Sequence, residues 1–538
     1  MSFKNFLKVL LTALFAIALV ACSSGDSDDG GNDNGDDDGS SEEATEGGEL
    51  RVAYSAQPDS LDVHLSTAII AAEVMGHVFE TLLTTDSDYN IKPMLAESYE
   101  QSEDGKTVTF HLRDDVVFHN GEDMTADDVV ASMNRWKEGP GGRGQFEDAI
   151  FEAEDDYTVV LTMEEPLSTA VSSIAQGSSS FAAILPKESI ENAEADEDDP
   201  FVKTDELIGT GPFQLEEWKQ DQYIHLAKYD DYVGIDEPAD GLFGEKEALV
   251  DDLYFEIVTD PSTRVAGLQS GEYDIAQEVP YDSADQLESD ENIENNIIPG
   301  AGTLVMFTNK KVGPFTDPVA REALATLIDV EEMMTAAFTD PKYFSLNHNL
   351  MMPHQEEVWY SDEGKDMYNV NDPDKAKELF EEAGYDGEEI TIMTSRDYEF
   401  MYNASVVLQS ELESIGMNVK LDIYDWATLL DNMTDETAFD INMIWLGYKP
   451  EPTSHHFLNT EISGWTDSEE LDELMEKFRS QPTLEDAQPV FGELQAWFYD
   501  YLPAIKLGDY NRVDSTRTSV DNYQFSDRMI LWNVSNNK

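Results

Sequence analysis

Cys22 is the only cysteine among the 538 residues of the chain. With one thiol near the N-terminus, the folded body can contain neither a disulfide bond nor a zinc–thiolate site, and it has no cysteine nucleophile. Its stability must therefore come from hydrophobic packing, for which 41% hydrophobic and 10% aromatic residues are ample. A chain of this length is too long for one hydrophobic core, so it predicts two or three domains.

The residues before Cys22 have the layout of a secretory signal. Two lysines precede an apolar run, residues 9–21, which is too short to span a bilayer. Residues 19–22, Leu-Val-Ala-Cys, resemble the lipobox of bacterial lipoproteins, in which the chain is cut before the cysteine and the cysteine is acylated. The resemblance implies a signal peptide over residues 1–21 and a lipid on Cys22 that anchors the protein to the outer face of the cytoplasmic membrane. The alternative is a plain signal peptide with an incidental cysteine.

Acidic residues dominate the chain, with 113 of them against 32 basic residues and a formal net charge of −81. Residues 22–48 combine acids with almost no apolar side chain, which predicts a disordered tether. An acidic surface repels nucleic acid and anionic lipid head groups, so we expect no nucleic-acid partner. Because salt screens self-repulsion, the composition also favours a salt- or alkali-adapted source.

Apolar periodicity indicates mixed α and β structure throughout the body of the chain. Alternation with a period of two residues predicts strands at residues 49–54 and 106–113, whereas helical spacing predicts a helix at residues 68–83. Thr125 followed three residues later by Asp128 is a variant of the capping box, so a helix is expected to begin there.

The second half of the chain contains a predicted βαβ unit. Residues Asp372–Gly384 carry an N-cap, a proline at the first helical position and a closing glycine, which together predict a helix. A strand (389–394), a helix (403–415) and a strand (418–424) follow. Because pockets in such sheets form at the carboxyl ends of the strands, we expect site residues at 394–402 and after the next strand.

Several stretches together resemble one family of proteins. Residues 125–130 read Thr-Ala-Asp-Asp-Val-Val, and residues 209–213 read Gly-Thr-Gly-Pro-Phe. The full set comprises residues 96–99, 104–113, 117–122, 125–130, 208–213, 271–275, 317–324 and 372–384. This set resembles the large extracytoplasmic solute receptors of ABC importers of the peptide/nickel type (family 5), collinearly from about Glu49 to the C-terminus.

The resemblance implies an α/β fold, a two-lobed periplasmic-binding-protein-like clamp of type II (large cluster C) with an extra α/β subdomain. Lobe I is then expected to comprise residues 49–303 and 504–538, with the extra subdomain at about 85–200 inside it. Lobe II is expected to comprise residues 304–503. Two hinge strands near the lobe boundaries would let the clamp close around a ligand.

Peptide-binding relatives hold the ligand carboxylate with an arginine and the ligand ammonium with an aspartate. In this chain Arg396 stands at the position of the carboxylate arginine of the dipeptide-binding members, with Tyr398 two residues further on. The resemblance therefore implies that Arg396 and Tyr398 contact the ligand. Alternatively, Arg396 only pairs with Asp397 or with other surface acids.

Residues 445–454 resemble the pocket segment of oligopeptide receptors, which runs from a tryptophan through an aspartate to Glu-Pro-Thr-Ser. Here Trp445 and Glu451 are present, but Tyr448 takes the place of the aspartate. A tyrosine ring can hold a cation by a cation–π contact, although it cannot neutralise it, and Glu451 is a possible substitute. The alternative for Trp445 and Tyr448 is core packing.

The resemblance implies a lipid-anchored, monomeric substrate-binding component that captures oligo- or dipeptides and delivers them to an ABC permease. Oligosaccharide capture is the alternative, because sugars need aromatic platforms and neutral hydrogen bonds. Nickel or metal-chelate binding ranks lower, since adjacent residues such as His455 and His456 seldom converge on one ion. We expect no enzyme activity and no cofactor, because serine-elbow, zinc-protease and phosphate-loop motifs are missing. A purely adhesive surface protein would fit the anchor but not the receptor motifs.

Overall fold

The computed structural model describes residues 47–142, 144–175, 177, 180–192, 206–447, 449, 451–460 and 463–538. By their contacts, the described residues belong to one compact unit. The predicted signal peptide, Cys22, nearly all of the predicted tether and Tyr448 therefore lie outside the described residues. Within the described part, none of the helices combines the length and the apolar character that crossing a membrane requires.

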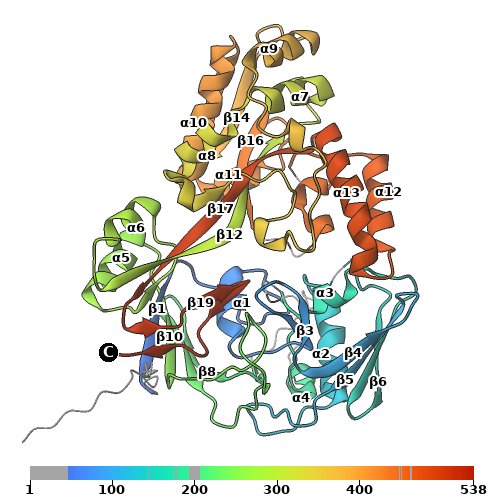
Figure 1. The fold of residues 1–538 in the computed structure, drawn as a ribbon, viewed down its shortest axis with the longest axis vertical. Coiled ribbons are helices and arrows are strands. Elements are labelled where there is room, and N and C mark those ends of the chain that lie inside the picture. The colour runs from blue at the N-terminus through green and yellow to red at the C-terminus, as the bar shows by residue number, and fades with distance from the viewer. Residues whose placement is uncertain are drawn as a thin grey trace, which may run out of the picture. The chain divides into compact units, whose positions relative to one another are not determined.

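Eleven strands of the described chain form one mixed sheet. The sheet joins strands that lie far apart in the sequence, so both ends and the middle of the chain contribute to it (Figure 1). Its order is β15 (Asn418–Tyr424), β14 (Glu389–Ser395), β16 (Ile441–Gly447), β12 (Ile293–Thr308), β17 (Ala504–Arg517), β11 (Ile275–Ala276), β1 (Glu49–Tyr54), β10 (Asp252–Ile257), β9 (Tyr223–Lys228) and β8 (Phe213–Lys219), with β13 (Phe344–Ser345) also on β17.

The antiparallel pair of β12 and β17 connects the two halves of this sheet. Figure 1 shows these long strands side by side, and their register runs from Ile293 opposite Arg517 to Phe307 opposite Ala504. The pairing is interrupted between Ile298 and Gly302, where the register shifts. Such a bulge disrupts the ladder and bends the strand locally. It lies beside the predicted hinge region.

The predicted βαβ unit is confirmed. Strands β14 and β15 pair in parallel, with Glu389 opposite Asn418, and α10 (Glu399–Ser414) connects them. The helix before this unit, α9 (Pro373–Glu382), begins as expected, because the Asp372 side chain accepts a hydrogen bond from the Lys375 amide.

The helix predicted over residues 68–83 is only partly present. It comprises α1 (Ile69–Met75), and residues 83–85 form β2 instead. The carbonyls of His77 and Val78 accept hydrogen bonds from Phe213 and Gly211. These tertiary bonds take main-chain acceptors that a longer helix would use, so tertiary context overrides the helical spacing.

A second, four-stranded antiparallel sheet lies in the first part of the chain. Helix α2 (Ala126–Glu138) belongs to the same region and begins with the predicted capping box of Thr125 and Asp128. The sheet order is β4 (Ala96–Gln101), β5 (Thr107–Leu112), β7 (Thr158–Thr162) and β6 (Ile150–Asp155). The remaining strands form small two-stranded pairs: β2 (Leu83–Thr85) with β3 (Ile91–Pro93), β18 (Val520–Asp521) with β21 (Ser535–Asn536), and β19 (Gln524–Ser526) with β20 (Arg528–Ile530).

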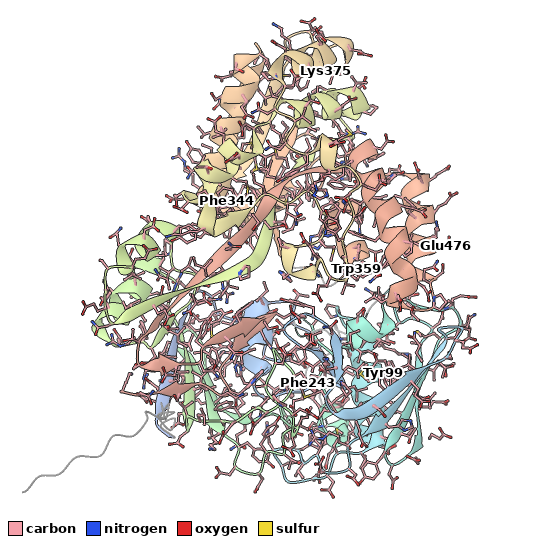
Figure 2. The ribbon with its side chains drawn as sticks, viewed as in Figure 1. Tyr99, Phe243, Phe344, Trp359, Lys375 and Glu476 are labelled. Carbon is pink, nitrogen blue, oxygen red and sulfur yellow. The ribbon has the colours of Figure 1, made fainter. Side chains whose placement is uncertain are left out.

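The other helices and short 3-10 turns pack around these sheets and leave the described chain with four hydrophobic cores. Trp359 is 2% exposed in one of them, whereas Lys375 and Glu476 are exposed on helix surfaces (Figure 2). The helices are α3 (Ala170–Ala175), α4 (Lys187–Glu191), α5 (Pro261–Ser270), α6 (Tyr281–Leu287), α7 (Pro318–Leu327), α8 (Val330–Phe338), α11 (Trp426–Asn432), α12 (Glu469–Arg479) and α13 (Leu484–Tyr501). The turns are η1 (Pro314–Thr316), η2 (Pro341–Tyr343), η3 (Pro353–Gln355), η4 (Lys365–Met367), η5 (Pro452–Ser454) and η6 (His456–Leu458).

Candidate functional site

Arg396 directly follows the last residue of β14, at the carboxyl end of that strand. Its guanidinium is exposed and stacks on the ring of Tyr402 from α10, with 4.2 Å between the guanidinium carbon and the ring centroid. One nitrogen, Nη2, donates a hydrogen bond of 2.7 Å to the Tyr402 hydroxyl. The ring and the hydroxyl together hold a flexible side chain in one orientation.

No carboxylate pairs with Arg396 in the part of the chain that the structure describes. Its sequence neighbour Asp397 instead accepts a hydrogen bond of 2.7 Å from the main-chain amide of Trp426, at the start of α11. Arg396 is therefore an exposed cation held by a tyrosine in a very acidic protein. Its remaining donors are available to a carboxylate.

Tyr398 belongs to a cluster of aromatic rings. Its ring centroid lies 4.8 Å from that of Trp426 and 5.7 Å from that of Trp445 on β16, and both contacts are edge-on. Trp426 and Trp445 stack with 6.3 Å between centroids. Trp445 is half-buried, and its indole N–H is buried without a hydrogen-bond partner in the described chain. The structure thus brings Tyr398 and Trp445 into contact, and their role in ligand binding stays a prediction.

Glu451 is buried and acts as a cap. Its Oε2 accepts hydrogen bonds of 2.6 Å from both the amide and the hydroxyl of Thr453, at the start of η5. Nearby, burial lowers the pKa of Lys449, and the Glu451 carboxylate opposes that shift. Among the described contacts, none joins Glu451 to Tyr398 or Trp445. Its role as an ammonium ligand stays a prediction.

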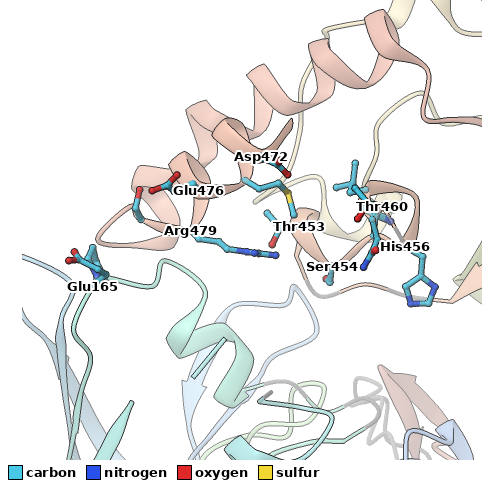
Figure 3. A pocket seen from close by; sticks show the side chains of 14 residues that line it. Glu165, Thr453, Ser454, His456, Thr460, Asp472, Glu476 and Arg479 are labelled. Carbon is cyan, nitrogen blue, oxygen red and sulfur yellow. The ribbon is translucent and has the colours of Figure 1, made fainter. Parts of the chain in front are cut away.

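A pocket of about 810 Å³ opens beside η5 and α12. Glu165, from the loop after β7, lines the pocket together with Asp472 and Arg479 from α12. The pocket wall therefore carries both acidic and basic side chains. In Figure 3 the Arg479 side chain extends from α12 toward Thr453. Sequence reasoning did not find this pocket, because its walls come from distant segments.

His455 lines the same pocket and is 8% exposed. Its ring stacks on Phe457 at 4.7 Å, and neither ring nitrogen has a hydrogen-bond partner in the described chain. Burial, with a smaller contribution from Lys449 and Lys506, holds the pKa of His455 well below its usual value. The imidazole is therefore neutral at pH 7. The described residues contain no group of three or more His, Cys, Asp or Glu side chains placed to hold a metal ion.

The comparisons with known proteins identify the family of the chain. Residues 90–466 match the family of bacterial extracellular solute-binding proteins, family 5 middle, and the chain belongs to this family. A probable peptide ABC transporter periplasmic-binding protein of Sinorhizobium fredii is 31% identical over 459 residues, which cover 80% of this chain and 83% of that protein. The chain is accordingly an extracellular solute-binding protein and not an enzyme.

Two solved structures show the same fold. The oligopeptide-binding protein AppA of Bacillus subtilis, in complex with a nonapeptide, has a TM-score of 0.72 and 24% identity, and the match covers 92% of this chain and 100% of AppA. AgaA of A. tumefaciens R10, in complex with agropinic acid, has a TM-score of 0.71 and 24% identity, covering 91% of this chain and 99% of AgaA. The predicted periplasmic-binding-protein fold is confirmed. One fold holds ligands of different chemistry, so the ligand must be argued from side chains.

Proposed function

We propose that the protein captures peptides outside the cytoplasmic membrane and delivers them to an ABC permease. The observation that carries this proposal is the Arg396 guanidinium, which is exposed, oriented by Tyr402 and not paired with an acid in the described chain. A planar guanidinium binds a carboxylate through two parallel hydrogen bonds. A peptide supplies that carboxylate at its C-terminus.

The aromatic cluster supports the same ligand. The rings of Tyr398, Trp426 and Trp445 supply apolar surface for side chains. The relative in Sinorhizobium fredii is named a probable peptide ABC transporter periplasmic-binding protein, and AppA holds a nonapeptide. Both agree with a peptide ligand.

Delivery is proposed to use clamp closure and membrane anchoring. The strands β12 and β17 would act as hinges between lobe I (residues 49–303 and 504–538) and lobe II (304–503), with the bulge at Ile298–Gly302 absorbing the bend. Lipid on Cys22 would keep the monomeric receptor near its permease and raise its effective concentration.

The proposal is tested by incubating the purified protein with a library of synthetic peptides of two to nine residues and identifying retained peptides by mass spectrometry. Retention of peptides with a free C-terminal carboxylate supports it. Retention of none of them, at concentrations up to about 1 mM, contradicts it. Release of a Cys22→Ser variant from cell membranes, with peptide retention unchanged, tests the anchor separately.

Oligosaccharide capture is the second candidate. Trp426 and Trp445 lie with 16° between their ring planes and both are half-buried, which would suit the apolar face of a sugar ring. A neutral sugar gains nothing from the charge of Arg396. Retention of oligosaccharides in place of peptides would therefore favour this reading. A metal chelate ranks third.

A further inference from the structure

Two residues from the first half of the chain, Gln101 and Ser168, contact the turn between α12 and α13. The Ser168 hydroxyl donates a hydrogen bond of 2.9 Å to the Phe478 carbonyl, and the Ser168 amide donates one of 2.9 Å to the Arg479 carbonyl. Gln101, at the end of β4, donates from Nε2 to the Pro482 carbonyl at 2.9 Å. Three hydrogen bonds thus join segments that are distant in the sequence.

Gly105 lets these segments approach each other closely. It lies in the turn between β4 and β5 with a φ of 68°, in the left-handed region that favours glycine. A Cβ atom at this position would lie 2.6 Å from both the Cα atom and the carbonyl oxygen of Pro482. Because these are main-chain atoms of a residue with a fixed φ, they cannot move aside unless the whole turn at residues 480–483 shifts.

All three acceptors are carbonyls at the C-terminal end of α12 or just beyond it. The last four carbonyls of an α-helix have no partner within the helix and need other donors. Ser168 supplies two donors, for the consecutive carbonyls of Phe478 and Arg479, from outside the helix. When such bonds break, water replaces the lost donors, so each bond costs little net free energy to open.

The contact joins two separately packed bodies. Leu167 and Ala170, on either side of Ser168, belong to the hydrophobic core of the four-stranded sheet. Phe478 belongs to a different core, which packs α12 and α13 against β12 and β16. These two cores share no residue among those described. Each body can therefore keep its own core when the two bodies separate.

The contact also lies away from the strands proposed as hinges. In Figure 1, β12 and β17 cross toward the left, whereas α12 descends to the region of the four-stranded sheet on the right. The pocket of about 810 Å³ lies beside the contact, between Glu165 and α12, so apolar packing does not close this edge (Figure 3). A rotation about β12 and β17 displaces distant points most, so opening of the clamp breaks these hydrogen bonds.

We propose that Gln101, Gly105 and Ser168 form a latch with residues 478–482, which holds the clamp closed over its ligand and sets the rate at which the ligand leaves. This inference rests on the proposed function, because the closed, peptide-bound clamp is the state that the latch stabilises. None of the described contacts joins the latch to Arg396. The latch therefore acts on residence time for every ligand alike, whereas ligand contacts set specificity.

Stopped-flow measurement of peptide dissociation tests the latch with a matched pair of glycine variants. Gly105→Ala places a Cβ atom against Pro482, whereas Gly121→Ala, at a φ of 83°, has a similar backbone cost with no atom within 4 Å. Gly105→Ala should speed the release of a retained peptide and of its C-terminally amidated form by the same factor, about 3- to 10-fold. Gly121→Ala should stay within about 2-fold of wild type.

Ser168→Ala is a milder second variant, because alanine removes the hydroxyl donor but keeps the amide bond to Arg479. We expect its peptide release to be about 2- to 5-fold faster than that of wild type. Ser172→Ala is the control, since the Ser172 hydroxyl donates to the nearby Thr169 carbonyl at 3.0 Å. Urea unfolding of all four variants verifies their folding.

Spin labels report whether the clamp opens. Because Cys22 is the only cysteine, a Cys22→Ser protein can be labelled at Glu152→Cys on β6 and Lys375→Cys on α9, which are both exposed. With saturating peptide, double electron–electron resonance should give one main distance between the labels. Adding Gly105→Ala should introduce a second, longer distance.

The outcomes separate the latch from the proposed function. If the wild-type protein retains no peptide, the proposed function fails and the latch fails with it. If it retains peptides but Gly105→Ala releases them at the wild-type rate, peptide binding stands and the latch is refuted. A lower free energy of unfolding with unchanged release also refutes it, because the contact then only supports the fold. Faster release of both peptide forms in Gly105→Ala and Ser168→Ala, but not in the controls, supports it.

Discussion

The Nη2 atom of Arg396 lies 2.7 Å from the hydroxyl oxygen of Tyr402, and the guanidinium stacks on the same ring. The two residues are six positions apart, at the end of β14 and inside α10. The βαβ crossover therefore supplies both the cation and the group that orients it. An oriented cation loses less conformational entropy when it binds a carboxylate than a freely rotating one.

Replacing Tyr402 by phenylalanine should weaken the binding of peptides with a free C-terminus by about 2- to 10-fold, because the ring remains but the hydrogen bond to Arg396 is lost. Titration calorimetry measures the effect. The C-terminally amidated form of the same peptide serves as control and should change little. An equal loss for both forms would show that Tyr402 does not act through Arg396.

Replacing Arg512 by methionine should lower the free energy of unfolding by about 3–5 kcal/mol, because Glu73 and Asp514 would then be buried without their cation. Urea unfolding followed by circular dichroism measures the change. Lys420→Met, which breaks the more exposed pair with Asp422, is the control and should cost less than about 1 kcal/mol. A similarly small cost for Arg512→Met would contradict the buried network.

The stability of the protein should fall as the pH drops below about 6.5, the usual pKa of histidine. Burial lowers the pKa of His64 to about 4, so below pH 6.5 the unfolded chain binds a proton that the folded protein excludes. The contribution of neutral His64 to the free energy of unfolding is complete above pH 6.5. It is lost toward pH 4, at about 1.4 kcal/mol per pH unit.

The variant His64→Gln checks this assignment. Glutamine keeps a donor for the Ala183 carbonyl, which His64 Nε2 contacts at 2.9 Å, but it does not titrate. Between pH 6.5 and pH 4.5, its free energy of unfolding should decline less steeply than that of the wild type. Parallel declines would mean that His64 is not buried in its neutral form.

Salt should stabilise the protein. A net charge of −81 makes the repulsion between its acidic side chains strong in the folded state, and counterions screen that repulsion. We expect the melting temperature to rise steadily between 0.1 and 2 M NaCl, measured by differential scanning calorimetry. A melting temperature that stays constant or falls would argue against a salt-adapted surface.

Sequence reasoning succeeded where the signals are local. The capping box of Thr125 and Asp128 and the βαβ unit around α10 depend on residues close in sequence, and both are present. The helix expected to run to residue 83 ended at Met75, because hydrogen bonds from distant residues 211 and 213 are not visible in local spacing.

The residues of the candidate site were likewise predictable from the sequence only where their signals are local. Arg396, Tyr398 and Trp445 could be named because they lie beside strand ends in recognisable motifs, and ring contact between Tyr398 and Trp445 brings two of them together. The pocket beside η5 and α12 could not be predicted, because its lining comes from the loop after β7, from residues 453–460 and from α12, which lie far apart in the sequence.

The central claim, that Arg396 takes the carboxylate of a peptide, is tested most directly by titrating wild-type and Arg396→Ala protein with one retained peptide and with its C-terminally amidated form. We predict that Arg396→Ala weakens binding of the free-carboxylate form by about 10-fold or more. Binding of the amidated form should change by less than about 2-fold, the scale of an uninvolved surface substitution. Undiminished affinity of Arg396→Ala for the free-carboxylate peptide would contradict the claim.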